Sequence, residues 1–280
     1  MSKIIVGNWK MNGSKALIDA LFTAATGAQH SVSIPTTCPC GTSIKSCQSN
    51  ARIETDIDVD IVAKCYHQAS PSLKNSAVIC PPFSLISYAA QVLSPLFSIG
   101  AQDCSEFDSG AHTGDVSCAQ IQEAGGTFVI LGHSERRQGN GESDGLIARK
   151  LACARNNRLT PIVCVGESRD DYSQKKTREV LSRQLLPLRS HLGAGSVFIA
   201  YEPIWAIGSG LVPSNAEIDD VHKFIFETCG ITPFYGGSVT ADNYKPIIEL
   251  DSVGGLLIGG ESLKPERFVS IIYAEVTKDY

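Results

Sequence analysis

This sequence of 280 residues lacks the features that mark nucleic-acid-binding and membrane proteins. No block of Lys and Arg stands out, the formal net charge is −5 and the pI is about 5.7, so a nucleic-acid partner is not expected. No apolar run is long enough to cross a bilayer, so no membrane association is expected. The first expected strand begins at Lys3, which leaves no room for a signal or transit peptide, and we expect a cytoplasmic protein.

The sequence also has no cofactor fingerprint and no clear constellation of metal ligands. No glycine-rich dinucleotide-binding turn follows the first expected strand. Cys38 and Cys40 are separated by one residue instead of the two of a usual zinc site. Six of the ten cysteines are spread through the regular elements, most of them beside apolar residues, as free thiols are in a reducing compartment: Cys80, Cys104, Cys118, Cys153, Cys164 and Cys229.

Short apolar runs alternate with longer segments of helical period along most of the chain. Helices are expected between most of these runs, for example at Lys15–Ala25, Leu146–Asn156, Lys175–His191 and Asn215–Cys229. The alternation predicts an α/β fold, a single (β/α)8 barrel over residues 1–280, with a doubly wound parallel sheet as the alternative. The expected strands are Lys3–Gly7, Ala77–Cys80, Phe97–Ala101, Phe128–Leu131, Pro161–Val165, Val197–Tyr201, Ile231–Tyr235 and Gly255–Ile258.

The stretch Tyr201–Gly210, YEPIWAIGSG, places Glu202 at the carboxyl end of one apolar run. Its middle, IWAI, is too apolar for an ordinary exposed loop, and Gly208 and Gly210 allow backbone conformations that other residues resist. We interpret the stretch as a rigid lid, whose closure would remove water from Glu202 and make the carboxylate a stronger base. A structural acid at a strand end is the alternative.

Two further polar groups follow other expected strands, at the end of a barrel where active sites are built. Lys10, beside Asn8, suits an anionic substrate, although a surface lysine would look the same. His133 precedes an expected helix start, with Ser134 as its possible cap. The positive end of a helix dipole disfavours imidazolium, so we expect a neutral His133 that donates a hydrogen bond, with a structural histidine as the alternative.

Paired glycines follow the seventh and eighth expected strands, in YGGSV (235–239) and IGGES (258–262). Such pairs let backbone amides converge on one anion, and barrel enzymes often bind phosphate here. One pair alone would fit a tight turn, but two pairs with Ser238 predict a phosphate site. A base, a neutral electrophile, a cation and a phosphate site together suit proton transfer beside the carbonyl of a small phosphorylated sugar.

These motifs resemble those of triosephosphate isomerases along the whole chain except Gln29–Asn75. The resemblance implies a TIM barrel that interconverts dihydroxyacetone phosphate and D-glyceraldehyde 3-phosphate through an enediolate, in glycolysis and gluconeogenesis, without a metal or organic cofactor. The matching segments are NWKMN (8–12), GHSERR (132–137), CVGE (164–167), YEPIWAIGSG (201–210), YGGSV (235–239) and IGG (258–260).

The resemblance also implies a role for each site residue. Glu202 would be the base that moves a proton between two carbons, and His133 the electrophile that polarises the carbonyl. Lys10 would stabilise negative charge, and Asn8 would help to position the substrate. The phosphate would be held by backbone amides of Gly208, Ser238, Gly259 and Gly260.

Supporting residues follow from the same resemblance. Glu135 would orient the region of Lys10, and Tyr235 and Ser238 would latch the closed lid, which keeps the enediolate from losing phosphate. The family forms homodimers, so the loop Gln102–Ser117 would protrude into a second copy of the chain and support its active site.

The chain departs from the family pattern in several places, one of them Leu211, where many relatives have a Lys that is not in the catalytic set. Gln29–Asn75 is much longer than the usual link between the first helix and second strand, and we expect a surface insertion at 29–75, on the barrel face opposite the active site. The segment between Asn215 and Tyr235 is shorter than usual. Glu261 replaces the usual Ala after the glycine pair, where a carboxylate would repel phosphate if it pointed inward or complement a helix dipole if it did not.

Two other functions fit the same residues. An isomerase of a four-carbon ketose phosphate would use the same catalytic groups. A weakly active paralogue would instead use its insertion to bind a partner or to sense oxidation through four cysteines: Cys38, Cys40, Cys47 and Cys65.

Overall fold

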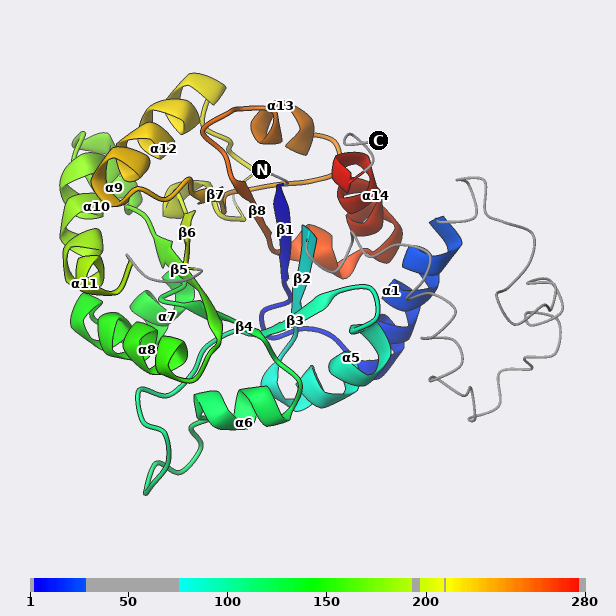
Figure 1. The fold of residues 1–280 in the computed structure, drawn as a ribbon. Coiled ribbons are helices and arrows are strands. Elements are labelled where there is room, and N and C mark those ends of the chain that lie inside the picture. The colour runs from blue at the N-terminus through cyan, green and yellow to red at the C-terminus, as the bar shows by residue number, and fades with distance from the viewer. Residues whose placement is uncertain (1–2, 29–75, 193–196, 209, 277–280) are drawn as a thin grey trace, which may run out of the picture.

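The computed structural model describes residues 3–28, 76–192, 197–208 and 210–276. Eight parallel strands close into a barrel in chain order, because β1 pairs with both β2 and β8. This confirms the (β/α)8 barrel, and Figure 1 shows the helices arranged around the strands. The strands are β1 (Ile4–Asn8), β2 (Ala77–Cys80), β3 (Ser98–Ala101), β4 (Phe128–Leu131), β5 (Thr160–Val165), β6 (Phe198–Tyr201), β7 (Phe234–Tyr235) and β8 (Gly255–Ile258).

The helices follow the strands, and α1 (Lys15–Ala28) packs beside the last one, α14 (Pro265–Val276). The helix expected over Lys175–His191 was wrong as one element. Pro187 interrupts it, since proline cannot donate the helical hydrogen bond, and three short helices take its place. The remaining elements are η2 (Phe83–Leu85), α5 (Ile86–Leu93), α6 (Cys118–Glu123), α7 (Ser134–Gly139), α8 (Asp144–Asn156), α9 (Arg169–Ser173), α10 (Thr177–Leu185), η3 (Leu186–Leu188), α11 (Arg189–Leu192), η4 (Ile204–Ala206), α12 (Asn215–Cys229), α13 (Tyr244–Ile248) and η5 (Gly260–Leu263).

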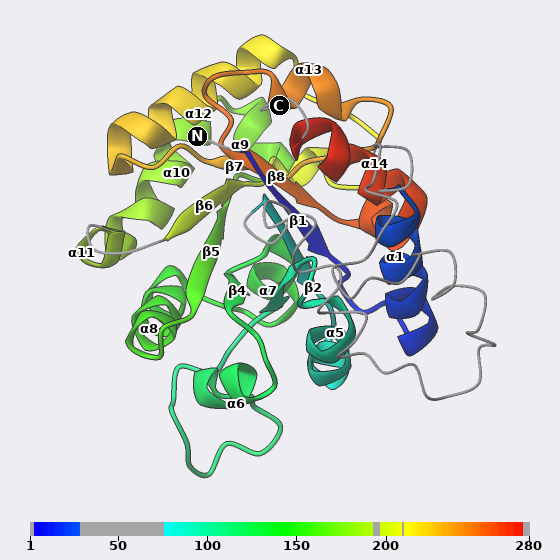
Figure 2. The same ribbon diagram turned by 45° about the vertical axis from the view of Figure 1, so that its right-hand side comes forward.

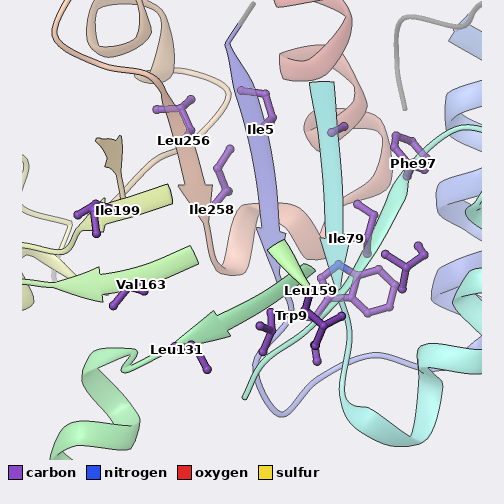
Figure 3. Packing of buried hydrophobic residues seen from close by; sticks show 14 of the residues in the cluster. Ile5, Trp9, Ile79, Phe97, Leu131, Leu159, Val163, Ile199, Leu256 and Ile258 are labelled. Carbon is purple, nitrogen blue, oxygen red and sulfur yellow. The ribbon is translucent and has the colours of Figure 1, made fainter. Parts of the chain in front are cut away.

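The strand side chains alternate between two apolar layers. Ile5, Ile79 and Ile199 belong to the larger core between strands and helices, part of which Figure 3 shows. Their neighbours along the strands, such as Val6 and Ala200, form a separate cluster with other strand residues and fill the barrel. Both faces of the sheet are therefore buried, which explains why the strands are apolar throughout.

The short connection before β7 does not prevent closure of the barrel. Helix α12 ends at Cys229, and its C-cap Gly230 adopts the left-handed conformation at φ 74°. The strand expected at Ile231–Tyr235 is reduced to Phe234 and Tyr235, preceded by Pro233. These two residues still pair with β6 on one side and β8 on the other.

One loop among the described residues lies outside the barrel proper. The loop at residues 102–117 extends away from the body of the molecule beside α6 (Figures 1 and 2). The expected insertion at 29–75, with Cys38, Cys40, Cys47 and Cys65, lies outside the described residues. Within the ranges described, no helix is both long enough and apolar enough to span a membrane.

Candidate active site

A cavity of about 230 Å³ opens at the carboxyl ends of the strands. All eight residues that the sequence analysis assigned to catalysis or phosphate binding line it, although they come from five separate segments of the chain. They are Asn8, Lys10, His133, Glu202, Gly208, Ser238, Gly259 and Gly260.

The alternation of the strands explains why two of these side chains meet. Val6 lies inside the barrel, so Asn8, two residues later, emerges at the same inner face. Ala200 also lies inside, and Glu202 follows it with the same parity. Both polar side chains are nearly buried, with exposed fractions of 5% for Asn8 and 2% for Glu202.

Glu202 is held by two hydrogen bonds at the floor of the cavity. Its Oε1 lies 3.0 Å from His133 Nε2, and its Oε2 accepts the backbone N–H of Ser134 at 3.0 Å. Burial raises the pKa of Glu202, but His133, the Ser134 amide and Lys10 together lower it by more, so the pKa lies below its ordinary value. The carboxylate is therefore ionised, as a general base must be.

His133 itself is the N-cap of α7, so the assignment of Ser134 as the cap was wrong. The His133 Nδ1 accepts the N–H of Glu135 at 3.2 Å, and Ser134 is the first helical residue. Burial lowers the pKa of His133, but the Glu202 carboxylate raises it by more. This carboxylate outweighs the helix end that we expected to favour a neutral ring. The Glu135 N–H still excludes a proton from Nδ1, so the neutral imidazole carries its proton on Nε2, facing the cavity.

Lys10 has a left-handed backbone at φ 54°, a conformation that costs a non-glycine residue about 1–2 kcal/mol. Asn8 Oδ1 accepts its N–H at 3.0 Å, and Gln102 Nε2 donates to its carbonyl at 2.8 Å. The Lys10 ammonium lies 2.5 Å from Glu135 Oε1. Its Cε lies 3.5 Å from the position that a β-carbon on Gly259 would take, so the cation reaches the glycine pair after β8.

The stretch that we interpret as a lid follows Glu202 with Pro203 and η4. Trp205 Nε1 donates to Glu167 Oε1 at 2.9 Å, and the hydroxyl of Tyr201 donates to the same oxygen at 3.1 Å. The hydroxyl of Ser238 donates to the carbonyl of Ala206, which joins the lid to the loop after β7. Beyond η4, Gly208 has a φ of 66°, which a residue with a side chain resists.

The glycine pair after β7 lets the chain pass close to Glu202. A β-carbon on Gly236 would lie 3.0 Å from Cγ of Glu202, and one on Gly237 would lie 2.2 Å from the Tyr235 hydroxyl. That hydroxyl is buried and forms no hydrogen bond with any of the described residues. Close approach, rather than a turn alone, therefore requires glycine here.

Several residues around the site were not assigned to it from the sequence, among them Gln102 and Leu257. Gln102 bridges the carbonyls of Lys10 and Cys80, at 2.8 and 2.9 Å, and so fixes the loop that carries the cation. Leu257 lines the cavity from inside the barrel, and its place in an apolar strand gave no sign of this. In the described part of the chain no group of His, Cys, Asp and Glu side chains could hold a metal ion.

Comparison with known proteins gives consistent matches. The sequence profile of the family described as triosephosphate isomerase matches residues 58–275. The triosephosphate isomerases of Rhizobium meliloti (strain 1021) and Halorhodospira halophila (strain DSM 244 / SL1) are 37% and 36% identical to the chain. These alignments cover 98% and 97% of this chain, and 97% of each relative. The crystal structure of triosephosphate isomerase from Bartonella henselae is similar with a TM-score of 0.74 at 30% identity, covering 99% of this chain and 100% of that one.

Proposed function

The chain belongs to the triosephosphate isomerase family, whose members interconvert dihydroxyacetone phosphate and D-glyceraldehyde 3-phosphate, and we propose that Glu202 is its base and His133 its electrophile. The observation that supports these roles best is the contact of the two side chains, 3.0 Å apart on the floor of one cavity. An ionised carboxylate and an imidazole N–H converge there on the space that a small substrate would occupy.

The Glu202 carboxylate must exchange partners before it can act. Both of its oxygens accept hydrogen bonds in the structure, from His133 and from the Ser134 amide. A substrate carbonyl that accepts the Nε2 proton of His133 replaces the carboxylate there. Glu202 is then free to turn toward the carbon next to the carbonyl and accept its proton, with its proton-accepting strength raised by the loss of two hydrogen-bond donors.

The departure of Glu202 also keeps His133 a neutral donor. The Glu202 carboxylate is the main group that raises the pKa of His133, Glu135 adds to it, and burial and Lys10 act against them. Once the carboxylate has turned away, the ring has little reason to take a second proton, and Nε2–H stabilises the developing enediolate oxygen. The Lys10 ammonium adds positive charge on the same side, and Asn8 holds the strained backbone that presents it.

The phosphate of the substrate would lie between the loops after β7 and β8. Ser238, Gly259 and Gly260 line that end of the cavity, and Gly208 lines it from the lid. Convergent backbone amides bind phosphate without a full positive charge. Closure of the lid over this group would expel water and keep the enediolate from eliminating phosphate, with Tyr235 and Ser238 as latches.

The assignment of the base is tested by isomerisation of D-glyceraldehyde 3-phosphate coupled to reduction of the product. Glu202→Gln keeps the size of the side chain and removes the base, so kcat should fall by roughly a thousandfold or more. A circular dichroism spectrum identical to that of the native protein would show that the fold is kept. Turnover that is unchanged in this variant would refute the role of Glu202. A four-carbon ketose phosphate assayed in parallel gives the substrate preference.

We also propose that the protein forms a homodimer through the loop at 102–117. Residues 107–115 of this loop are exposed, and Phe107 stacks on His112 with ring centroids 4.0 Å apart. An exposed aromatic pair on a protruding loop is typical of a protein-binding element. Sedimentation should give the mass of two chains, and a monomer at micromolar concentration would contradict the proposal.

The cytoplasm is the location that we propose, with a role in glycolysis and gluconeogenesis. The six cysteines within the described residues are free thiols, including Cys118 and Cys153, whose sulfur atoms lie 3.7 Å apart. Such neighbouring thiols stay reduced in a reducing compartment.

A further inference from the structure

Glu261 is a buried carboxylate that lies beside the proposed phosphate site without lining it. We define the β7 loop as residues 236–243 and the β8 loop as residues 259–264. Glu261 belongs to the β8 loop, is 5% exposed, and is absent from the walls of the cavity to which Gly259 and Gly260 contribute. The catalytic proposal gives it no task.

The contacts of Glu261 join three elements. Its Oε1 accepts the backbone N–H of Ala241 in the β7 loop at 3.0 Å. The same oxygen accepts a hydrogen bond from Arg267 of α14, and Oε2 accepts one from Lys264 at 2.9 Å. Arg267 also bonds Asp242 of the β7 loop at 2.6 Å. One side chain thus connects the β7 loop, the β8 loop and the helix behind them.

Hydrogen bonds continue from Ala241 to the phosphate-binding end of the β7 loop. The adjacent residue, Thr240, donates its N–H to Asn243 Oδ1 at 2.8 Å. Asn243 in turn donates from Nδ2 to the carbonyl of Ser238 at 3.1 Å. The position of Ser238, a proposed phosphate ligand, is therefore coupled to the acceptor that Glu261 provides.

The charge of Glu261 is balanced on the side away from the cavity. Burial raises its pKa, but the Ala241 amide, Lys264 and Arg267 lower it by more, so the carboxylate is ionised. Two cations and one amide satisfy both of its oxygens. A charge neutralised in this way exerts little repulsion on a phosphate, and a buried carboxylate with such partners holds its neighbours in one geometry.

We propose that Glu261 is a positioning residue that holds the β7 and β8 loops at the separation that phosphate binding requires. The inference rests on the proposed function, because it takes the phosphate site between these loops as given. It makes the opposite prediction from a simple electrostatic view, in which removal of a negative charge near the site would tighten phosphate binding.

The test compares Glu261→Ala and Glu261→Gln with Asp242→Asn as the matched control. Asp242 also pairs with Arg267, but it is exposed and does not bind the other loop. Each variant is assayed for kcat, KM, the thermal midpoint and the inhibition constant of inorganic phosphate. In Glu261→Ala the KM and the inhibition constant should both rise about tenfold, the cost of one charge-assisted hydrogen bond, with a smaller fall in kcat.

Glu261→Gln should give a smaller rise, because its amide oxygen still accepts the Ala241 N–H, and Asp242→Asn should match the native protein. An unchanged inhibition constant in Glu261→Ala with a lowered thermal midpoint would reduce Glu261 to a structural role and overturn the proposal. A lower inhibition constant in Glu261→Gln would overturn it in favour of repulsion. Failure of phosphate to bind the native protein would overturn the phosphate site itself. A native protein without isomerase activity would refute the proposed function, while calorimetric titration with phosphate would still test Glu261.

Discussion

Replacement of Lys150 by Met should destabilise the protein severely, because Lys150 is a buried cation between two buried carboxylates. Its ammonium lies 2.8 Å from both oxygens of Asp103 and 2.6 Å from Glu142 Oε1. The exposed fractions of the three residues are between 5% and 7%. Arg136 completes the group, at 2.9 Å from Asp103 and 2.7 Å from Glu142.

The size of the expected loss of stability follows from the negative charge that Lys150 no longer balances. With Lys150 present, two cations face two carboxylates; without it, one buried negative charge has no counterpart. Breaking a buried pair costs roughly 3–5 kcal/mol, and because Arg136 still touches both carboxylates we expect about 3 kcal/mol. Burial already raises the pKa of Asp103 and Lys150 opposes this rise, so Asp103 in the variant should take up a proton at higher pH. The loss should therefore be smaller at pH 5 than at pH 7.

Urea unfolding followed by circular dichroism and by fluorescence, at one protein concentration, measures this loss. Lys223→Met is the matched control, since Lys223 bonds Asp219 one helical turn away but is 64% exposed. Solvent screens that pair, so its removal should leave the unfolding free energy nearly unchanged. Equal effects of the two substitutions would refute the reasoning that burial decides the value of the pair.

Two further predictions concern the site and its support. Gly236→Ala places a β-carbon 3.0 Å from Cγ of Glu202, so the carboxylate must shift, and kcat should fall roughly ten- to a hundredfold at little cost in stability; Gly139→Ala, with open space around it, should not change kcat. A normal kcat in Gly236→Ala would show that Glu202 tolerates the shift. Burial lowers the pKa of His222 to about 4, below the value of about 6.5 in an unfolded chain. The stability from keeping His222 neutral is full above pH 6.5 and is lost as the pH falls toward 4, by about 3 kcal/mol in all. His222→Leu should flatten this acid limb in urea unfolding, and an unchanged slope would contradict the assignment.

The strands were predictable because their burial follows from local pattern. Seven of the eight lie within a residue or two of their expected bounds, since apolar runs between helical segments leave few choices. The errors arose where proline and tertiary contacts act against the pattern. Pro187 divides a segment whose helical period continues beyond it, and Pro233 stands before a β7 that is reduced to its last two residues.

The residues that line the cavity could be predicted from the sequence for a related reason, whereas the hydrogen bonds among them could not. A residue at a strand end has a face set by parity, so Asn8 and Glu202 could be placed at the mouth of the barrel from sequence alone. The cap formed by His133 depends on Glu135 and Glu202, the second of which is distant in the chain. No local signal reports such a contact.

Glu261 illustrates the limit of what the sequence alone could predict. From its position in the sequence, Glu261 could repel phosphate or complement a helix dipole. In the structure its main interactions are of neither kind. Its partners are Ala241, Lys264 and Arg267, and the first of these comes from a different loop. A barrel places the ends of distant strands beside one another, so a substitution at one strand end is compensated at the next. The effect of a departure from a family motif therefore has to be judged from the neighbouring loops, and not from the motif alone.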